Sequence, residues 1–228
     1  MSAILLIHQL AGILAFVVAP LAMAAAKGSQ AHRRWGKLFF YSMLVVCLTA
    51  ILAGIVRPNP LMALVAIFSF HLAASGYRSL ALKKLHEGQR MAKWDFILHG
   101  TAAVVNLGIL LWGTLNLAFG RADDAGIIFT AFGILGLFLV WRNVHQFYKR
   151  SVDKREWVYM HMSGSIGAYI ATVSAFSAVN LNFIKPMWLQ WLWPTIIGVP
   201  LLLWWMRRYR WEFTKGKRVS EVFPRMDR

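Results

Sequence analysis

The sequence predicts an all-α membrane protein, a polytopic helix bundle that forms a single domain. Of its 228 residues, 58% are hydrophobic and only 15% are charged, whereas a soluble domain carries about 25% charged residues. The charged residues lie in short clusters, which are separated by apolar stretches of about 20 residues, long enough to cross a bilayer as a helix. Both observations indicate a chain whose helices are surrounded by lipid.

Seven apolar stretches follow one another, and each is close to the length of a helix that crosses about 30 Å of hydrocarbon. The predicted spans are Ile4–Ala26, Leu38–Val56, Leu61–Leu82, Phe96–Phe119, Ala125–Val144, Val158–Val179 and Met187–Met206. A signal peptide carries basic residues before its apolar stretch, whereas here they follow it, so we expect the first stretch to be retained as a helix. Segment 207–228 is expected to form a basic tail.

Lysine and arginine are distributed unequally between the loops. Segments 27–37, 78–93, 142–155 and 207–228 contain four, five, five and eight of them, which is 22 of the 25 in the chain. Because basic residues collect in cytoplasmic loops, we expect about seven transmembrane helices with the N-terminus outside and the C-terminus in the cytoplasm. The same rule accounts for the net charge of +16, so we expect no nucleic acid as a partner.

The expected partners are those of a membrane protein without a soluble domain. The lipid bilayer surrounds the helices, and the basic tail is expected to contact anionic lipid headgroups, at about 1 kcal/mol per basic residue near the surface. Small residues recur at four-residue spacing in the sixth span, at Ser163, Gly167, Ala171 and Ala175. Such spacing favours close packing against another helix or a membrane-protein partner. The alternative is that it leaves room for a porphyrin or quinone ring.

Histidines are the candidate functional residues within the spans. Acidic residues are absent from the interior of every predicted span, and Asp95 at the start of the fourth lies nearest. This argues against ion-coupled transport, which needs buried carboxylates, whereas a histidine in a bilayer is costly unless it is paired or ligating. The candidates are His8 near the outer end of the first span, His71 in the middle of the third, His99, His145 and His161 near the cytoplasmic ends of the next three, and His32 in the first cytoplasmic loop.

His99 and His161 meet one condition for binding haem b. At about 1.5 Å rise per residue, each lies about 5 Å inside its cytoplasmic helix end, and a bis-histidine haem needs two imidazoles at similar depth on facing helices. His71 is expected to lie above them, nearer the middle of the membrane. At the same cytoplasmic face, Arg78 and Asp95 flank one loop, and we expect a structural salt bridge between them.

Five segments of the chain form a set, namely Lys27–Met43, Arg57–Pro60, Phe68–Arg78, His161–Ala171 and Trp193–Pro194. Together they resemble a bacterial family of predicted membrane proteins, domain of unknown function 2306. The resemblance implies a multi-pass protein of the bacterial inner (plasma) membrane. It implies candidate site positions at His8, His32, Arg33, Arg78 and His161. The remaining histidines are not among these positions, so His32 becomes the better partner for His161.

Two kinds of function stay open at this point. The first is a redox-linked module that binds haem b or a quinone, suggested by the intramembrane histidines and the 11 Trp. The second is a non-enzymatic accessory subunit of a membrane complex, suggested by the small-residue spacing and the basic tail. Uncoupled small-molecule transport is a further alternative. Cys47 is the only cysteine and the common catalytic and zinc motifs are missing, so we expect neither an enzyme nor a protein-ligated metal site.

Overall fold

The computed structural model describes residues 3–56, 60–119 and 124–216, and the secondary structure in this part of the chain is entirely helical. The α-helices are α1 (Ala3–Ala24), α2 (Gln30–Val56), α3 (Pro60–Arg78), α4 (Lys93–Ala118), α5 (Asp124–His145), α6 (Glu156–Asn180) and α7 (Met187–Thr214). Two short 3-10 helices, η1 (Ser79–Ala81) and η2 (Leu85–Glu87), lie between α3 and α4. The predicted all-α fold is confirmed for these residues.

Six of these helices are long and apolar enough to cross a membrane, namely α1, α2, α4, α5, α6 and α7. Large apolar side chains also cover the outside of the bundle. Ile55 and Val104, for example, are each 73% exposed, as expected for helices that face lipid rather than water. The seven predicted spans thus correspond to the seven α-helices. The helix that is not among the six long, apolar ones is α3, which has 19 residues.

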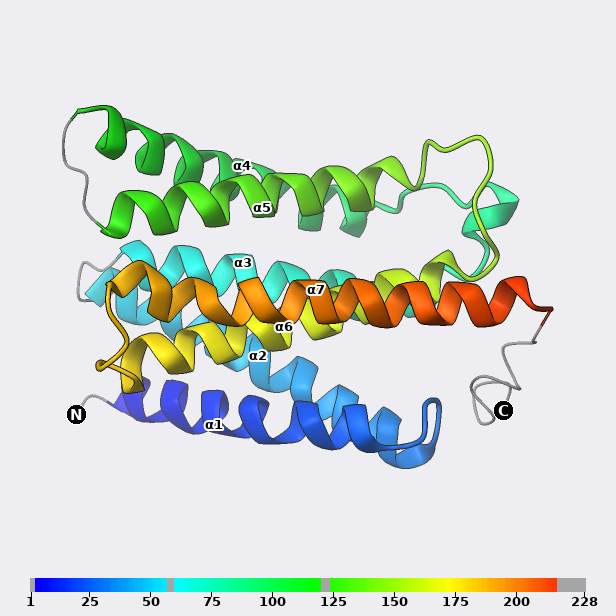
Figure 1. Cartoon of the computed structure of the whole chain (residues 1–228), viewed down its shortest axis with the longest axis horizontal. Coiled ribbons are helices and arrows are strands. Elements are labelled where there is room, and N and C mark those ends of the chain that lie inside the picture. The colour runs from blue at the N-terminus through cyan, green and yellow to red at the C-terminus, as the bar shows by residue number, and fades with distance from the viewer. Residues whose placement is uncertain (1–2, 57–59, 120–123, 217–228) are drawn as a thin grey trace.

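Consecutive helices run in opposite directions, and this places the basic segments at one end of the bundle (Figure 1). The α1–α2, α3–α4 and α5–α6 connections lie at that end, together with the last turns of α7. We call it the basic end. Residues 207–214 of the predicted tail are helical and continue α7, whereas residues 217–228 lie outside the described part of the chain. The lysines and arginines that cluster along the sequence therefore also lie together at one end of the bundle.

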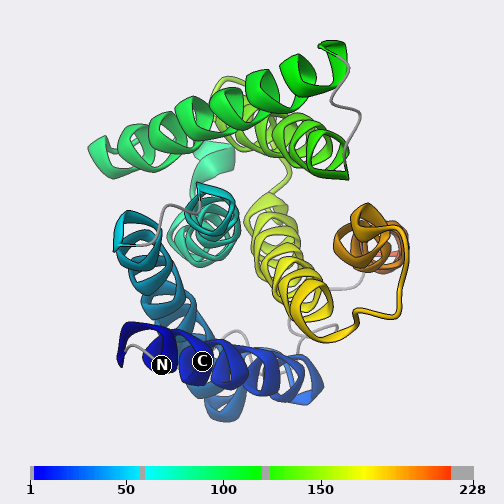
Figure 2. The same ribbon diagram turned by 90° about the vertical axis from the view of Figure 1, so that its left-hand side faces the viewer.

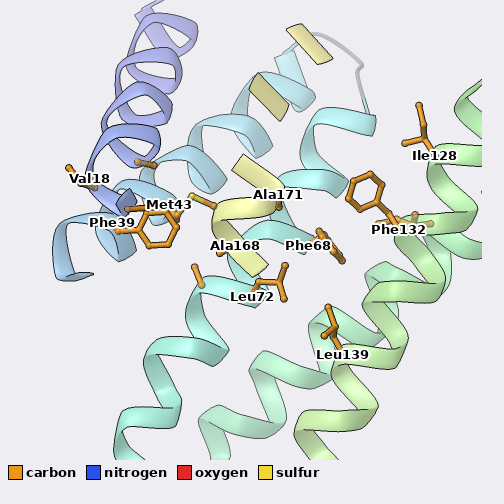
Figure 3. Close-up of a cluster of buried hydrophobic side chains, with 14 of the residues drawn as sticks. Val18, Phe39, Met43, Phe68, Leu72, Ile128, Phe132, Leu139, Ala168 and Ala171 are labelled. Carbon is orange, nitrogen blue, oxygen red and sulfur yellow. The ribbon is translucent and has the colours of Figure 1, made fainter. Parts of the chain in front are cut away.

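Helices α3 and α6 form the centre of the bundle, as Figure 2 shows, with α1 and α2 on one side and α4 and α5 on the other. The core runs across this centre. In Figure 3, Phe68 and Leu72 of α3 lie between Phe39 and Met43 of α2 and Phe132 of α5. The Phe68 and Phe132 rings meet edge to face, with their centroids 5.1 Å apart. Apolar packing therefore joins both outer pairs of helices to α3.

Two helices extend about two turns farther toward the basic end than hydropathy predicts. α2 begins at Gln30, where the Ser29 hydroxyl accepts a hydrogen bond of 3.1 Å from the His32 N–H and caps the helix. α7 continues to Thr214. The extra turns are rich in charged residues, so an apolar stretch does not include them. The expected position of His32 in a loop is therefore wrong, because His32 lies in the first turn of α2.

Glycines bring α3 and α6 into close contact. A Cβ atom built on Gly164 would lie 2.5 Å from the Cα atom of Gly76, and one built on Gly76 would lie 2.7 Å from the backbone nitrogen of Ser165. A Cβ atom on Gly167 would meet Leu72 at 3.4 Å, an ordinary contact. The tightest point of the α3–α6 contact is therefore Gly164, beside the four-residue series that includes Gly167.

We expect Gly76→Ala and Gly164→Ala to lower the thermal stability of the protein. Each new methyl group would push α3 and α6 apart, and overpacking of this kind costs about 1–3 kcal/mol. The measurement is the midpoint of thermal unfolding in a mild detergent. Gly100→Ala in α4 is the matched control, because a Cβ atom there meets nothing within 4 Å. Equal midpoints for the three variants would contradict the close contact.

Candidate functional site

His32 and His161 lie close together at the basic end of the bundle. His32 lies in the first turn of α2 and His161 in the second turn of α6. Their ring centroids are 6.2 Å apart, and the ring planes are nearly perpendicular, at 78°. Of the partners that the sequence suggested for His161, the structure therefore brings His32 to it.

In both imidazoles, Nδ1 forms a hydrogen bond with a backbone carbonyl oxygen. Nδ1 of His32 donates to the carbonyl oxygen of Ala22 at 2.8 Å, and Nδ1 of His161 donates to the carbonyl oxygen of Gly76, also at 2.8 Å. A carbonyl oxygen only accepts, so Nδ1 carries the proton in each ring. In the neutral imidazole this leaves the lone pair on Nε2, the arrangement typical of a histidine that is oriented to ligate.

A cavity of about 350 Å³ adjoins both histidines. Its lining comes from the ends of α1, α3 and α7 and the starts of α2 and α6 that meet at the basic end. Aromatic side chains form much of its wall, including Trp157, Tyr169 and Trp205, and Phe40 stacks on Tyr77 with ring centroids 4.5 Å apart. The cavity is therefore a largely apolar, aromatic space with two imidazoles in its wall.

Positive charge surrounds this cavity. Lys27, Arg33, Lys37 and Lys83 line it, and its described lining includes no acidic residue. Lys27 donates to the carbonyl oxygens of Met23 and Ala25, and its ammonium lies 5.8 Å from the centre of the Trp205 ring. Burial lowers the pKa of the Lys27 ammonium, because removing a charge from water disfavours the charged form. An anionic group bound here would offset that cost.

His99 does not pair with His161, the alternative that similar depth alone had allowed. Nδ1 of His99 instead lies 3.1 Å from Nε2 of His71, in a hydrogen bond between two buried rings. His71 is therefore level with His99 rather than above it. The reason is that α3 ends at Arg78 instead of at the predicted Leu82, which leaves His71 about two turns from the basic end.

His8 and His145 lie away from the cavity. Nδ1 of His8 contacts the carbonyl oxygen of Val46 at 3.2 Å and the Thr49 hydroxyl at 3.0 Å, so it joins α1 to α2. His145 is exposed, and its ring stacks on Trp141 with 5.2 Å between centroids. Groups of three or more His, Cys, Asp or Glu able to hold a metal ion are absent from the described residues.

Arg78 and Asp95 form the salt bridge that their positions predict. Arg78 donates to the two carboxylate oxygens of Asp95 through Nε at 2.7 Å and Nη2 at 2.9 Å. The Asp95 side chain is fully buried, and it also accepts a hydrogen bond of 2.8 Å from the Ala92 N–H at the start of α4. The pair links the end of α3 to the start of α4. Arg78 lies two residues after Gly76, whose carbonyl oxygen bonds to His161.

The sequence contained a signal for the position of His32 that hydropathy hides. Gly28 has a positive φ of 75°, and Ser29 follows it as the helix cap. A glycine in the preceding turn and a serine at the cap position are typical of the start of a helix. The positions of Ala22 and Gly76 as carbonyl acceptors had no such signal, because a backbone acceptor leaves no trace in residue type.

We expect Asp95→Asn to destabilise the protein by about 2 kcal/mol, since it leaves the Arg78 charge without its partner in a partly buried place. The midpoint of thermal unfolding in detergent measures this. Glu87→Gln is the control in the same loop, because the Glu87 side chain is 58% exposed and contacts only the neighbouring His86 among the ion pairs described. A loss of stability in the control as large as that in Asp95→Asn would overturn the assignment.

No family model, no curated protein and no solved structure matches this chain. The residues of the cavity and their geometry therefore carry the functional proposal.

Proposed function

We propose that this protein is a membrane-embedded haem b protein in which His32 and His161 would ligate the iron. The observation that carries the proposal is the pair of neighbouring imidazoles, each held by a backbone carbonyl through Nδ1 and each left with a lone pair on Nε2. Haem iron commonly takes ligands of this type from opposite sides of the porphyrin.

The separation of the rings agrees with this role. With about 2 Å from an imidazole nitrogen to a metal and about 1 Å more to each ring centre, two imidazoles on opposite sides of one ion have ring centres about 6 Å apart. The observed distance is 6.2 Å. Two protein ligands also suit haem, because the porphyrin itself supplies the remaining four nitrogens.

The surroundings of the histidines favour an amphipathic ligand with an acidic edge. The aromatic wall of the cavity suits the apolar faces of a porphyrin, as in other cofactor pockets. Lys27, Arg33, Lys37 and Lys83 would hold its propionates by charge-assisted hydrogen bonds. Small side chains of α1 and α2, among them Ala22 and Gly36, leave room beside the imidazoles.

The residues of the chain would orient the group and keep water from it. The carbonyls of Ala22 and Gly76 would set the rotation of the two rings, and the aromatic wall would lower the local dielectric, which influences the reduction potential. Bound in this way, haem supplies reversible one-electron transfer. The protein would then act as an electron carrier or a redox-linked subunit at the basic end of the bundle.

The His145→Ala, His32→Ala and His161→Ala variants test the ligands. We expect the wild-type protein, purified from haem-replete cells, to show a Soret band, and His32→Ala and His161→Ala to lose most of it because each removes an axial ligand. His145→Ala is the control and should keep the band, since His145 is exposed and stacks on Trp141. Absorption per chain is the measurement.

A fourth variant separates loss of a ligand from loss of the fold. We expect His32→Met to retain part of the haem with a raised reduction potential, since methionine–histidine ligation raises it. A wild-type protein without a Soret band, both as purified and after addition of hemin, would refute haem binding. An accessory subunit or an uncoupled transporter would then be the better hypothesis.

We also propose that all seven helices span a bacterial inner membrane with the basic end in the cytoplasm, and that the chain is a member of domain of unknown function 2306. The gathering of basic segments at one end supports the orientation, and the five sequence segments support the family.

Fusion reporters test the orientation. We expect a cytoplasm-active reporter, such as a fluorescent protein, to work when fused after the last residue, and a periplasm-active phosphatase to remain inactive there. The same phosphatase should be active when it is fused in the connection between α4 and α5. The opposite pattern at both positions would reverse the proposed orientation.

A further inference from the structure

A second cavity lies on the opposite face of α6 from the histidines. It measures about 400 Å³, and its lining, which comes from α3, α5, α6 and α7, shares no residue with that of the histidine cavity. Phe132, Leu139 and Leu202 are among the apolar side chains along it. We call it the α5–α7 groove. Figure 2 shows α5 and α7 on the same side of α6 as neighbours.

Three arginines line this groove where it reaches the basic end. They are Arg142 in the last turn of α5 and Arg207 and Arg210 on α7. Arg142 Nη2 donates to the hydroxyl of the buried Ser163. Arg210 Nη2 lies 3.7 Å from a carboxylate oxygen of Glu156, and its guanidinium lies over the Tyr159 ring at 4.5 Å.

The charges at this end of the groove do not balance. Three guanidinium groups stand against the single carboxylate of Glu156 that the described ion pairs place beside them. Arg142 is half-buried, and its hydrogen bond to Ser163 holds it against α6. An anion with several oxygens is the chemistry that arginine groups of this kind recognise.

The length of the groove indicates what the anion is attached to. Its lining on α7 extends from Arg210 to Thr195, which is about 22 Å along a helix. The part beyond the arginines, from Met206 to Thr195, measures about 17 Å. One leaflet of hydrocarbon is about 15 Å thick, half of a bilayer core. An acyl chain that starts at the arginines would therefore run along the groove for its whole length.

We infer that the α5–α7 groove binds an anionic phospholipid, with its phosphate at Arg142, Arg207 and Arg210 and an acyl chain along α5 and α7. Basic pockets between membrane helices bind such headgroups, and the apolar wall selects a lipid over a free anion. The site is separate from the histidine cavity and does not depend on haem.

Native mass spectrometry of the full chain in detergent tests this, with phosphatidylglycerol as the probe and phosphatidylcholine as the neutral comparison. We expect phosphatidylglycerol to bind preferentially. The triple variant Arg142→Gln/Arg207→Gln/Arg210→Gln should weaken that binding by roughly 100-fold, as three basic contacts predict. Lys149→Gln/Arg150→Gln/Lys154→Gln removes equal charge from exposed positions at the same end and should change it by less than about threefold.

A second pair of variants tests whether the chain occupies the groove. Val199→Trp would fill the groove and should weaken phosphatidylglycerol binding, whereas Ile197→Trp, at a position that is 53% exposed and outside the lining, should not. Unchanged binding in the arginine variant, or equal losses in both charge variants, would overturn the headgroup site. Sensitivity to the arginines without sensitivity to Val199→Trp would overturn the groove and leave only a charged surface.

Discussion

The close contact of α3 with α6 at Gly76 and Gly164 is the interaction on which the rest of the structure depends. Helices in lipid gain little from apolar burial against each other, so they associate where small residues let their backbones approach. At Gly76 that approach also brings the backbone carbonyl to Nδ1 of His161. The same atoms that pack the centre of the bundle therefore orient the imidazole of the candidate site.

One turn of α3 connects this contact to the neighbouring helices. Tyr77 stacks on Phe40 of α2 and lines the histidine cavity, and Arg78 binds Asp95 at the start of α4. Gly76, Tyr77 and Arg78 thus point to three different helices from consecutive positions. A change in this turn would therefore alter the α3–α6 contact, the wall of the histidine cavity and the α3–α4 connection at the same time.

The two histidine pairs show why contact alone does not make a site. His71 and His99 bond directly to each other in a buried place, so the ring nitrogens that meet are already used. His32 and His161 each bond to a backbone carbonyl, and their ring centroids lie 6.2 Å apart beside a cavity. A polar group in a membrane is costly unless it is paired. His71 and His99 meet part of that need through their mutual bond, whereas the Nε2 atoms of His32 and His161 are not used by the carbonyl bonds that hold these rings.

Hydropathy and charge are properties that can be read along the chain, and they determined the class of fold, the number of helices and the alternation that gathers the basic residues at one end. They also predicted the Arg78–Asp95 pair, because both residues flank one connection. They misplaced His32 and His71, because charged helical turns continue beyond the apolar stretch in α2 and because α3 ends early at Arg78.

Only the tertiary structure decided that His161 meets His32 and that His99 meets His71. Those pairings depend on which helices are neighbours and on how each is rotated about its axis, and both are decided by side-chain packing between segments far apart in the sequence.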